Sequence, residues 1–288
     1  MKTAIMTDTN SGFTSEEAKE LGIFLLPMPV IIDEATRYEG KNLTSEEFYE
    51  SLASGKDVTT SQPSPGDLMD MWDRILADGY DELVHIPMSS GLSNSCSTAI
   101  TLSADYNGKV QVADNHRISV TLKASVMEAK RMADDGRCAA EIKEHLEKHA
   151  YESSIYIAVD TLEFLKKGGR ITPAAAALGA VLNIKPILTI QGDKLDSFAK
   201  VRGMKKGRTV LIRALKDDLE NRFKDVEPSK LLIGAAGAGL TSEQEEDLKQ
   251  LMKENFPEYP FYYDPLSFSI GTHTGPGAWG VGIIVKGY

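Results

Sequence analysis

The chain has two cysteines, Cys96 and Cys138, in 288 residues, which is too few for a framework of disulfide bonds. We interpret both as free thiols of a protein that works in a reducing compartment. The chain also lacks an apolar run of the about 20 residues that a membrane-spanning helix needs, and its first residues do not have the pattern of a secretory signal. These absences favour a cytoplasmic protein with no segment inserted in a membrane.

Positive charge is scarce relative to negative charge, since 32 Lys and Arg stand against 42 Asp and Glu and the net charge is -10. A chain of this charge is a poor partner for nucleic acid or an anionic membrane surface. The sequence also lacks a Walker-type phosphate loop, a Gly-x-Gly-x-x-Gly sequence after the first predicted strand, and a cluster with the spacing of metal ligands. We therefore expect neither a nucleotide cofactor nor a metal.

Apolar residues make up 42% of the chain, enough for a substantial core in two domains. Strand-like and helix-like segments alternate along the chain, which is typical of the α/β class. Residues 1–153 repeat a strand–loop–helix pattern, so we predict a first domain with a parallel, Rossmann-like sheet. Residues 154–288 follow a different order and are predicted to form a second α/β domain. Further crossings of the chain between the domains are left open.

Three segments lead to specific expectations about local structure. Residues 23–32 read as one strand, which two prolines either place at the edge of a sheet or leave partly irregular. Residues 185–201 read as a hairpin that turns at Gly192 and Asp193. Residues 261–269 are predicted to form a closing strand, followed by a glycine-rich loop at 271–277.

Three short loops rich in hydroxyl, amide and glycine residues lie between these apolar segments. They are residues 59–64 (Thr-Thr-Ser-Gln-Pro-Ser), 89–95 (Ser-Ser-Gly-Leu-Ser-Asn-Ser) and 271–277 (Gly-Thr-His-Thr-Gly-Pro-Gly). Hydroxyl groups and free backbone N–H groups can donate to an anion from several directions. We therefore expect the three loops to converge on one small anionic group.

Ser93 lies where an apolar strand passes through a glycine-containing loop into a predicted helix. Backbone N–H groups at a helix start point outwards and carry roughly half a positive charge. An anion held near the Asn94 and Ser95 amides could therefore accept a hydrogen bond from Ser93. The alternative is that Ser93 only caps the helix. Both interpretations use the same geometry and stay open.

Two further pairs of residues are candidates for the same site. Thr60 and Ser61 precede Gln62, whose amide both donates and accepts, although this segment alone is typical of a surface turn. His273 and Thr274 precede a Gly-Pro-Gly sequence that allows close approach of the backbone. A histidine there can bind a carboxylate and lies near its charge switch. We therefore favour His273 over the other four histidines of the chain.

The basic sequence at residues 166–170 (Lys-Lys-Gly-Gly-Arg) also has two interpretations. Such a run is usually a solvated surface. Arg170 can instead bind a carboxylate or phosphate with two parallel hydrogen bonds, at an edge where a partner docks. The four alanines at 174–177 are either ordinary helix or a lining that leaves room for a slim apolar ligand.

Six short sequences, in this order over essentially the whole chain, resemble the DegV family of bacterial fatty-acid-binding proteins. They are Asp8 with Ser11 and residues 60–64, 89–93, 168–171, 184–188 and 273–277. The resemblance implies a two-domain α/β fold with a long-chain fatty acid buried between the domains. The acyl tail would occupy an apolar tunnel, and the carboxylate would meet the hydroxyl-rich loops.

The resemblance also implies a partner, a separate ATP-dependent fatty acid kinase. This chain would present the carboxylate for phosphorylation and carry away the acyl phosphate, with no catalytic machinery of its own. The implied carboxylate site consists of Thr60, Ser61, Ser93, Asn94, His273 and Thr274, and the edge facing the kinase or the phosphate carries Arg170 and Arg202. The chain departs from the family at 94–96, where Asn-Ser-Cys follows Ser93 in place of the usual glycine. Head-group geometry and acyl-chain preference are therefore left open.

Two other functions compete with this one. The first is a serine hydrolase or acyltransferase with Ser93 as nucleophile and His273 as base. The sequence around Ser93, Gly-Leu-Ser-Asn-Ser, departs from the Gly-x-Ser-x-Gly elbow of such enzymes. The second is a protein that binds a nucleotide or sugar phosphate at the helix start, which the missing glycine fingerprint disfavours.

Overall fold

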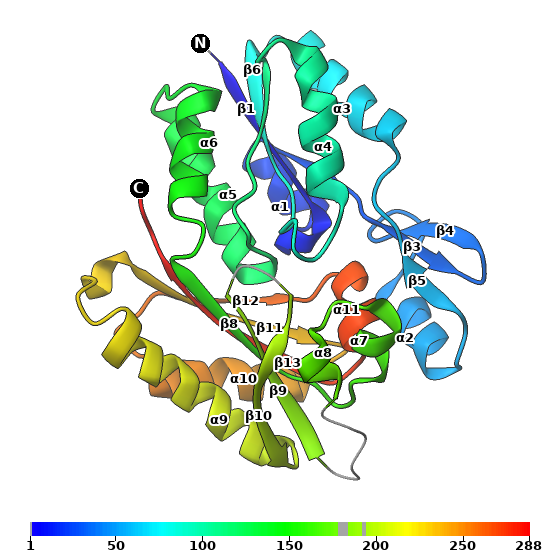
Figure 1. Cartoon of the computed structure of the whole chain (residues 1–288), viewed down its shortest axis with the longest axis vertical. Coiled ribbons are helices and arrows are strands. Elements are labelled where there is room, and N and C mark those ends of the chain that lie inside the picture. The colour runs from blue at the N-terminus through cyan, green and yellow to red at the C-terminus, as the bar shows by residue number, and fades with distance from the viewer. Residues whose placement is uncertain (1, 178–183, 192–193) are drawn as a thin grey trace.

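A parallel sheet forms the first part of the molecule. The computed structural model describes residues 2–177, 184–191 and 194–288. It contains a four-stranded sheet with the order β2-β1-β6-β7, in which all neighbours are parallel. Figure 1 shows this sheet in the upper part of the molecule. The predicted Rossmann-like sheet is thus confirmed, with strands β1 (Thr3–Asp8), β2 (Ile23–Leu26), β6 (Glu82–Ile86) and β7 (Val110–Val112).

Helices cover both faces of the parallel sheet, because successive side chains of a buried strand point to opposite faces. Ala4 and Met6 of β1 share a core with α3 and α4, whereas Ile5 belongs to the core on the α5 and α6 side. The helices of this part are α1 (Ser15–Glu20), α3 (Pro65–Ala77), α4 (Ser95–Ser103), α5 (Ser119–Asp134) and α6 (Ala139–Lys148), with short 3-10 turns at Thr9–Ser11 and Ala104–Tyr106.

A six-stranded mixed sheet forms the second part, with the order β10-β9-β8-β13-β11-β12. β11 and β12 are parallel, and the other neighbours are antiparallel. Its strands are β8 (Ser153–Ala158), β9 (Ile184–Ile190), β10 (Asp196–Arg202), β11 (Leu231–Ala238), β12 (Phe261–Pro265) and β13 (Ala278–Val285). The two strands of the predicted hairpin are present as β9 and β10, and its turn at Gly192 and Asp193 lies outside the described residues.

The two faces of the six-stranded sheet have different neighbours. Tyr156 and Ile233 pack against α9 (Met204–Asp217) and α10 (Ser242–Asn255), which lie on the side away from the parallel sheet (Figure 1). Ile155 and Ile157 face the other way and join the core that contains α5. A π-helical turn at Asp218–Arg222 and a 3-10 turn at Pro228–Lys230 connect α9 to β11.

α5 lies between the two large sheets, and its first turn packs very closely against the second. A Cβ built on Gly234 of β11 would lie 2.7 Å from the Cβ of Val120, closer than real side chains approach. Only glycine therefore lets the helix approach β11 this closely. Through this contact α5 fixes the spacing of the two sheets, between which the candidate site lies.

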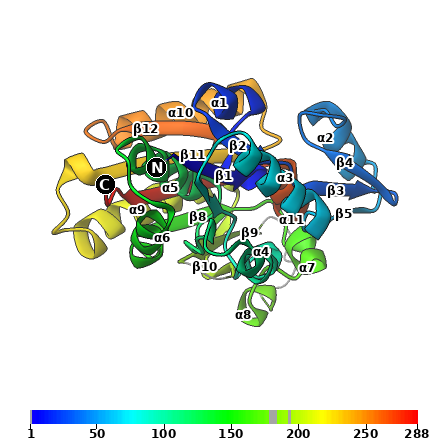
Figure 2. The same ribbon diagram turned by 90° about the horizontal axis from the view of Figure 1, so that it is seen from above.

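A small antiparallel sheet and a helix stand at the side of the molecule, as the view from above also shows (Figure 2). They are β3 (Pro29–Ile32), β4 (Ala35–Tyr38), β5 (Val58–Thr60) and α2 (Ser45–Ala53). This unit contacts α11 (Phe268–Thr274), which in turn contacts α7 (Glu163–Gly168). The short α8 (Pro173–Ala176) follows α7 in the chain.

Two predicted strands are wrong in their extent. Residues 23–32 form β2 and β3, which belong to different sheets, because Pro27 has no N–H to continue a ladder. Residues 261–269 form a strand only to Pro265, after which Ser267 accepts a hydrogen bond from the Ile270 N–H (3.3 Å) and starts α11. Most of the predicted loop at 271–277 is consequently helical up to Thr274.

The parallel sheet takes its strands from residues 3–112 and the six-stranded sheet from residues 153–285. The predicted division of the chain into residues 1–153 and 154–288 stays a prediction. Across the three described ranges, none of the helices is both long enough and apolar enough to pass through a membrane.

Candidate functional site

A cavity lies between the six-stranded sheet and the N-terminal end of α5. It leaves about 90 Å³ in which the centre of a water molecule can move, several times the roughly 10–15 Å³ that one water requires. One end is apolar, and its wall comes from the six-stranded sheet, the loops that follow β2 and β6 of the parallel sheet, the start of α5 and the segments around α7. The apolar lining includes Met28, Met88, Leu92, Ile118, Val120, Ile155, Ile157, Leu165, Ile190, Leu195, Ala236, Leu266, Ile270 and Val281.

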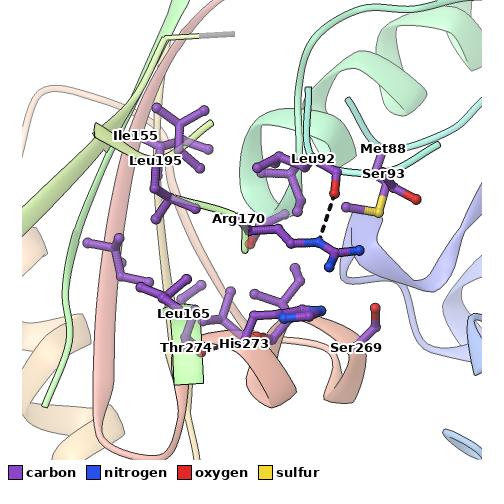
Figure 3. Close-up of a pocket in the computed structure, with 18 of the residues that line it drawn as sticks. Met88, Leu92, Ser93, Ile155, Leu165, Arg170, Leu195, Ser269, His273 and Thr274 are labelled. Atoms are coloured by element: carbon purple, nitrogen blue, oxygen red, sulfur yellow. Dashed lines mark hydrogen bonds between the residues drawn. The ribbon is translucent and has the colours of Figure 1, made fainter. Parts of the chain in front are cut away.

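The other end of the cavity is polar and is built by four separate segments of the chain. The end of β5 supplies Thr60, Ser61 and Gln62, and the loop after β6 supplies Ser93. α11 supplies hydroxyl groups and His273, and Arg170 follows α7. Figure 3 shows the labelled members of this set around one space, with the apolar side chains of Ile155, Leu165 and Leu195 beyond them.

Thr60 and His273 are joined by a hydrogen bond of 2.8 Å between Thr60 Oγ1 and His273 Nε2. Burial lowers the pKa of His273 to about 4, and the positive charge of Arg170 adds to this effect. The imidazole is therefore neutral at neutral pH, and it can donate from only one nitrogen. The predicted approach of these two residues, which lie in different loops of the sequence, is present in the structure.

The orientation of the His273 ring is fixed from its other side by Gly168 of α7. A Cβ built on Gly168 would lie 2.1 Å from His273 Nδ1, which no side chain allows. The ring is thus held between the Thr60 hydroxyl and the backbone of α7. Among the described residues, this backbone and no carboxylate lies on the Nδ1 side, and Nε2 is bonded to Thr60. The arrangement is therefore not the nucleophile–base–acid chain of a serine hydrolase.

The position of Ser93, directly before the N-cap Asn94 of α4, allows both of the roles that the sequence leaves open. Its backbone N–H donates to the Ser89 carbonyl (3.2 Å), which folds the loop, and its Oγ accepts from the Ser95 N–H (3.2 Å) at the start of α4. Accepting this bond leaves the Ser93 O–H free to donate towards the cavity. Capping the helix and binding an anion are therefore compatible functions of one side chain.

Arg170 closes the polar end from the side of the second sheet. Its Nε donates to the Leu92 carbonyl (3.2 Å), and its Nη1 donates to the Gly168 carbonyl. Figure 3 shows the tip of the guanidinium turned towards the space near Ser93 and Ser269. Both bonds end on neutral carbonyl groups, so the charge of Arg170 is available to an anion in the cavity.

The structure brings most, though not all, of the predicted site residues to the cavity. Thr274 lines it, but its hydroxyl donates to the Ile270 carbonyl of its own helix (3.3 Å). Ser61 lines it and is exposed. Asn94 is exposed and lies outside the lining, and Arg202, at the end of β10, is also exposed and outside it. The roles assigned to these residues stay predictions.

Three polar residues of the lining are missing from the predicted site, namely Gln62, Ser119 at the start of α5, and Ser269. Gln62 accepts a hydrogen bond from Thr98 Oγ1 at its Oε1 (3.1 Å), which leaves its amide N–H₂ to donate. Ser269 lies on α11 one turn before His273. The sequence contains a signal for it, because Ser267 is a good helix cap and Ser269 and His273 have the i, i+4 spacing of one helix face.

Within the described ranges, no group of three or more His, Cys, Asp or Glu residues is placed to hold a metal ion. The polar end therefore acts through hydroxyl and amide donors, one neutral imidazole and one guanidinium. Such a set can bind and orient an anion.

Comparison with known proteins identifies the family. The DegV family of uncharacterised proteins matches residues 2–286. A DegV domain-containing protein of Deinococcus radiodurans is 31% identical over 288 residues, which cover 98% of both chains. A fatty-acid-binding DegV family protein from Thermus thermophilus superposes with a TM-score of 0.87 at 26% identity, over 99% of this chain and 100% of that chain. DegV of Bacillus subtilis, a fatty acid binding protein, has a TM-score of 0.84 at 26% identity over the same shares. The chain belongs to the DegV family.

Proposed function

We propose that this chain binds a long-chain fatty acid in the cavity between its two large sheets. The observation that carries the proposal is the division of one cavity into an apolar wall and a compact polar end with a neutral histidine. A ligand that fits both has a long apolar tail and a small anionic head. The relatives of known structure that bind fatty acids support the same ligand class.

The head group meets donors that carry little charge of their own. A carboxylate only accepts hydrogen bonds. When the neutral His273 donates from Nε2 to Thr60 Oγ1, the Thr60 O–H is released to donate to the carboxylate. The Ser93 O–H donates beside it, and Arg170 supplies a positive charge nearby. Hydrogen bonds to an ionised acceptor are roughly twice as strong as neutral ones, so a few donors suffice to hold the head.

The tail supplies most of the binding free energy. A sixteen-carbon chain buries about fifteen methylene groups at roughly 0.8 kcal/mol each, a gross gain of about 12 kcal/mol before the costs of association. The apolar wall thus determines how tightly the ligand binds, and the polar end determines which head group is accepted.

We further propose that the chain presents the carboxylate to a separate fatty acid kinase, which uses ATP to form the acyl phosphate. The exposed Ser61 at the polar end supports access to the head group from outside. The sequence supports it too, because it has no phosphate loop of its own. Arg170 and Arg202 are the residues that we assign to the edge facing the kinase.

Native mass spectrometry of the purified protein, followed by solvent extraction, tests the binding step. We expect one fatty acid per chain, and transfer of phosphate to it when a bacterial fatty acid kinase and ATP are added. A mass equal to that of the protein alone, unchanged after several fatty acids are offered, would refute lipid binding. Stoichiometric lipid without phosphate transfer would refute the kinase step alone.

A further inference from the structure

Ser269 is a polar residue of the cavity that lies outside the six short sequences typical of the family. It lies on α11, is 7% exposed and lines the cavity together with His273. Among the described residues, its hydroxyl has no hydrogen-bond partner. Figure 3 shows this hydroxyl directed away from its helix into the space that Arg170 and Ser93 also face. Because this unpaired hydroxyl faces the cavity, a ligand bound there can accept a hydrogen bond from it.

The helix that carries Ser269 is held firmly at its N-terminal end. Ser267 Oγ donates to Asn10 Oδ1 (2.9 Å), and the Phe268 N–H donates to Glu39 Oε2 (3.0 Å). The Phe268 ring stacks on Phe48 with 4.6 Å between the ring centroids. These contacts come from both the first strand region and the small sheet, and they fix the position of Ser269 before any ligand binds.

The Thr60 and Ser93 hydroxyls can donate one hydrogen bond each, which is fewer than a carboxylate accepts. A carboxylate has two oxygens with about four acceptor positions in total. Thr60 reaches it from β5, and Ser93 reaches it from the loop before α4. Ser269 reaches it from α11 and can donate a hydrogen bond to the second carboxylate oxygen. A fatty alcohol has no such second oxygen and leaves that position without an acceptor.

We propose that Ser269 binds the fatty-acid head group and makes the site prefer a free carboxylate over an uncharged head of the same chain length. This inference rests on the proposed function and adds a residue that determines head-group specificity. It assigns Ser269 a part in binding and no part in a chemical step.

The test compares dissociation constants for hexadecanoic acid and hexadecan-1-ol, measured by displacement of a fluorescent fatty acid from delipidated protein. Ser269→Ala is expected to weaken binding of the acid about tenfold, the loss of one hydrogen bond to an ionised group, and binding of the alcohol less than about threefold. Ser269→Thr, which keeps the hydroxyl, should preserve the acid-to-alcohol ratio of the wild type. Thr272→Val is the matched control, since the Thr272 hydroxyl bonds the Phe268 carbonyl within the same helix (2.8 Å) and lies outside the lining.

Equal losses for acid and alcohol in Ser269→Ala would show a purely structural role and overturn the inference. Wild-type affinity for the acid in Ser269→Ala would also overturn it. Both outcomes leave the proposed function intact as long as the wild type binds the acid. Failure of the wild type to bind either lipid is the separate result that would remove the proposed function itself.

Discussion

The two ends of the cavity are built in opposite ways. The apolar wall is made of many side chains from regular strands and helices, each of which contributes a small part of the contact. The polar end depends on a few directed bonds, such as the one between Thr60 and His273, made by residues at the ends of elements. If the proposed function holds, tight binding is distributed over the wall, whereas selection of the head group is concentrated in single side chains.

The largest expected effect comes from a methyl group added behind the histidine. Gly168→Ala places a Cβ 2.1 Å from His273 Nδ1 and 2.8 Å from its Cε1. Either the ring or α7 must move, and the bond to Thr60 is lost. We expect the affinity for hexadecanoic acid to fall about tenfold or more, as measured by displacement titration.

Gly169→Ala is the matched control for this variant. Gly169 has a φ of +69°, and among the described residues no heavy atom lies within 4 Å of the position that an added Cβ would take. Alanine there strains the backbone without touching the site. We expect a loss of about 1–2 kcal/mol in the free energy of unfolding and an unchanged affinity. Wild-type affinity in Gly168→Ala would show that the ring position does not matter for binding.

A change of pH should affect the polar end and leave the wall unchanged, because the apolar residues do not titrate. Burial lowers the pKa of His273 to about 4 from its usual value of 6.5. Between these values the unfolded chain binds a proton at this position and the folded chain does not, so acid favours unfolding. The His273 contribution to stability is fully present above pH 6.5 and is lost as the pH falls towards 4.

Chemical denaturation of the wild type and of His273→Asn, at a series of pH values, isolates this contribution from other groups. We expect the wild type to lose about 1–3 kcal/mol of stability relative to His273→Asn on going from pH 7 to pH 4.5. A difference that stays constant over this range would contradict a depressed pKa for His273.

The smallest effect on affinity is expected from shortening one side chain of the apolar wall. Ile157→Val removes one methyl group from a cavity-lining residue of β8. The loss of contact is worth roughly 0.8 kcal/mol at most, so the affinity for hexadecanoic acid should fall less than about fourfold. Ile233→Val on the opposite face of the same sheet should destabilise the fold similarly and leave the affinity unchanged. A tenfold loss in Ile157→Val would mean that the wall also contains a residue that dominates binding.

The parallel sheet could be predicted from the sequence because mostly apolar strand-like segments alternate with helix-like segments, and because β1 and β6 each lead into a glycine-containing turn. Thr60, Ser93 and His273 could be proposed together because each lies in a short segment dense in hydrogen-bond donors. The family resemblance then added the ligand class, which composition does not contain. None of these signals required knowledge of how distant strands pair.

What the sequence did not reveal depends on long-range packing. α11 was missed because it starts shortly after β12, which ends at Pro265, and because its glycine and threonine residues are weak helix formers. The contacts of Ser267 with Asn10 and of Phe268 with Glu39 stabilise that helix from segments more than two hundred residues away. Ser269 was overlooked as a consequence, since the predicted strand ended at Ser269 and the predicted loop at 271–277 contained His273, which placed the two residues in different elements.

The bond between Thr60 and His273 joins residues 213 positions apart in the chain. Closing so long a loop costs entropy that only the finished tertiary structure offsets. During synthesis, Thr60 leaves the ribosome long before its partner exists. The polar end of the cavity therefore cannot form until His273 has been synthesised. A chain truncated before this residue retains every strand of the parallel sheet but lacks the histidine that bonds Thr60.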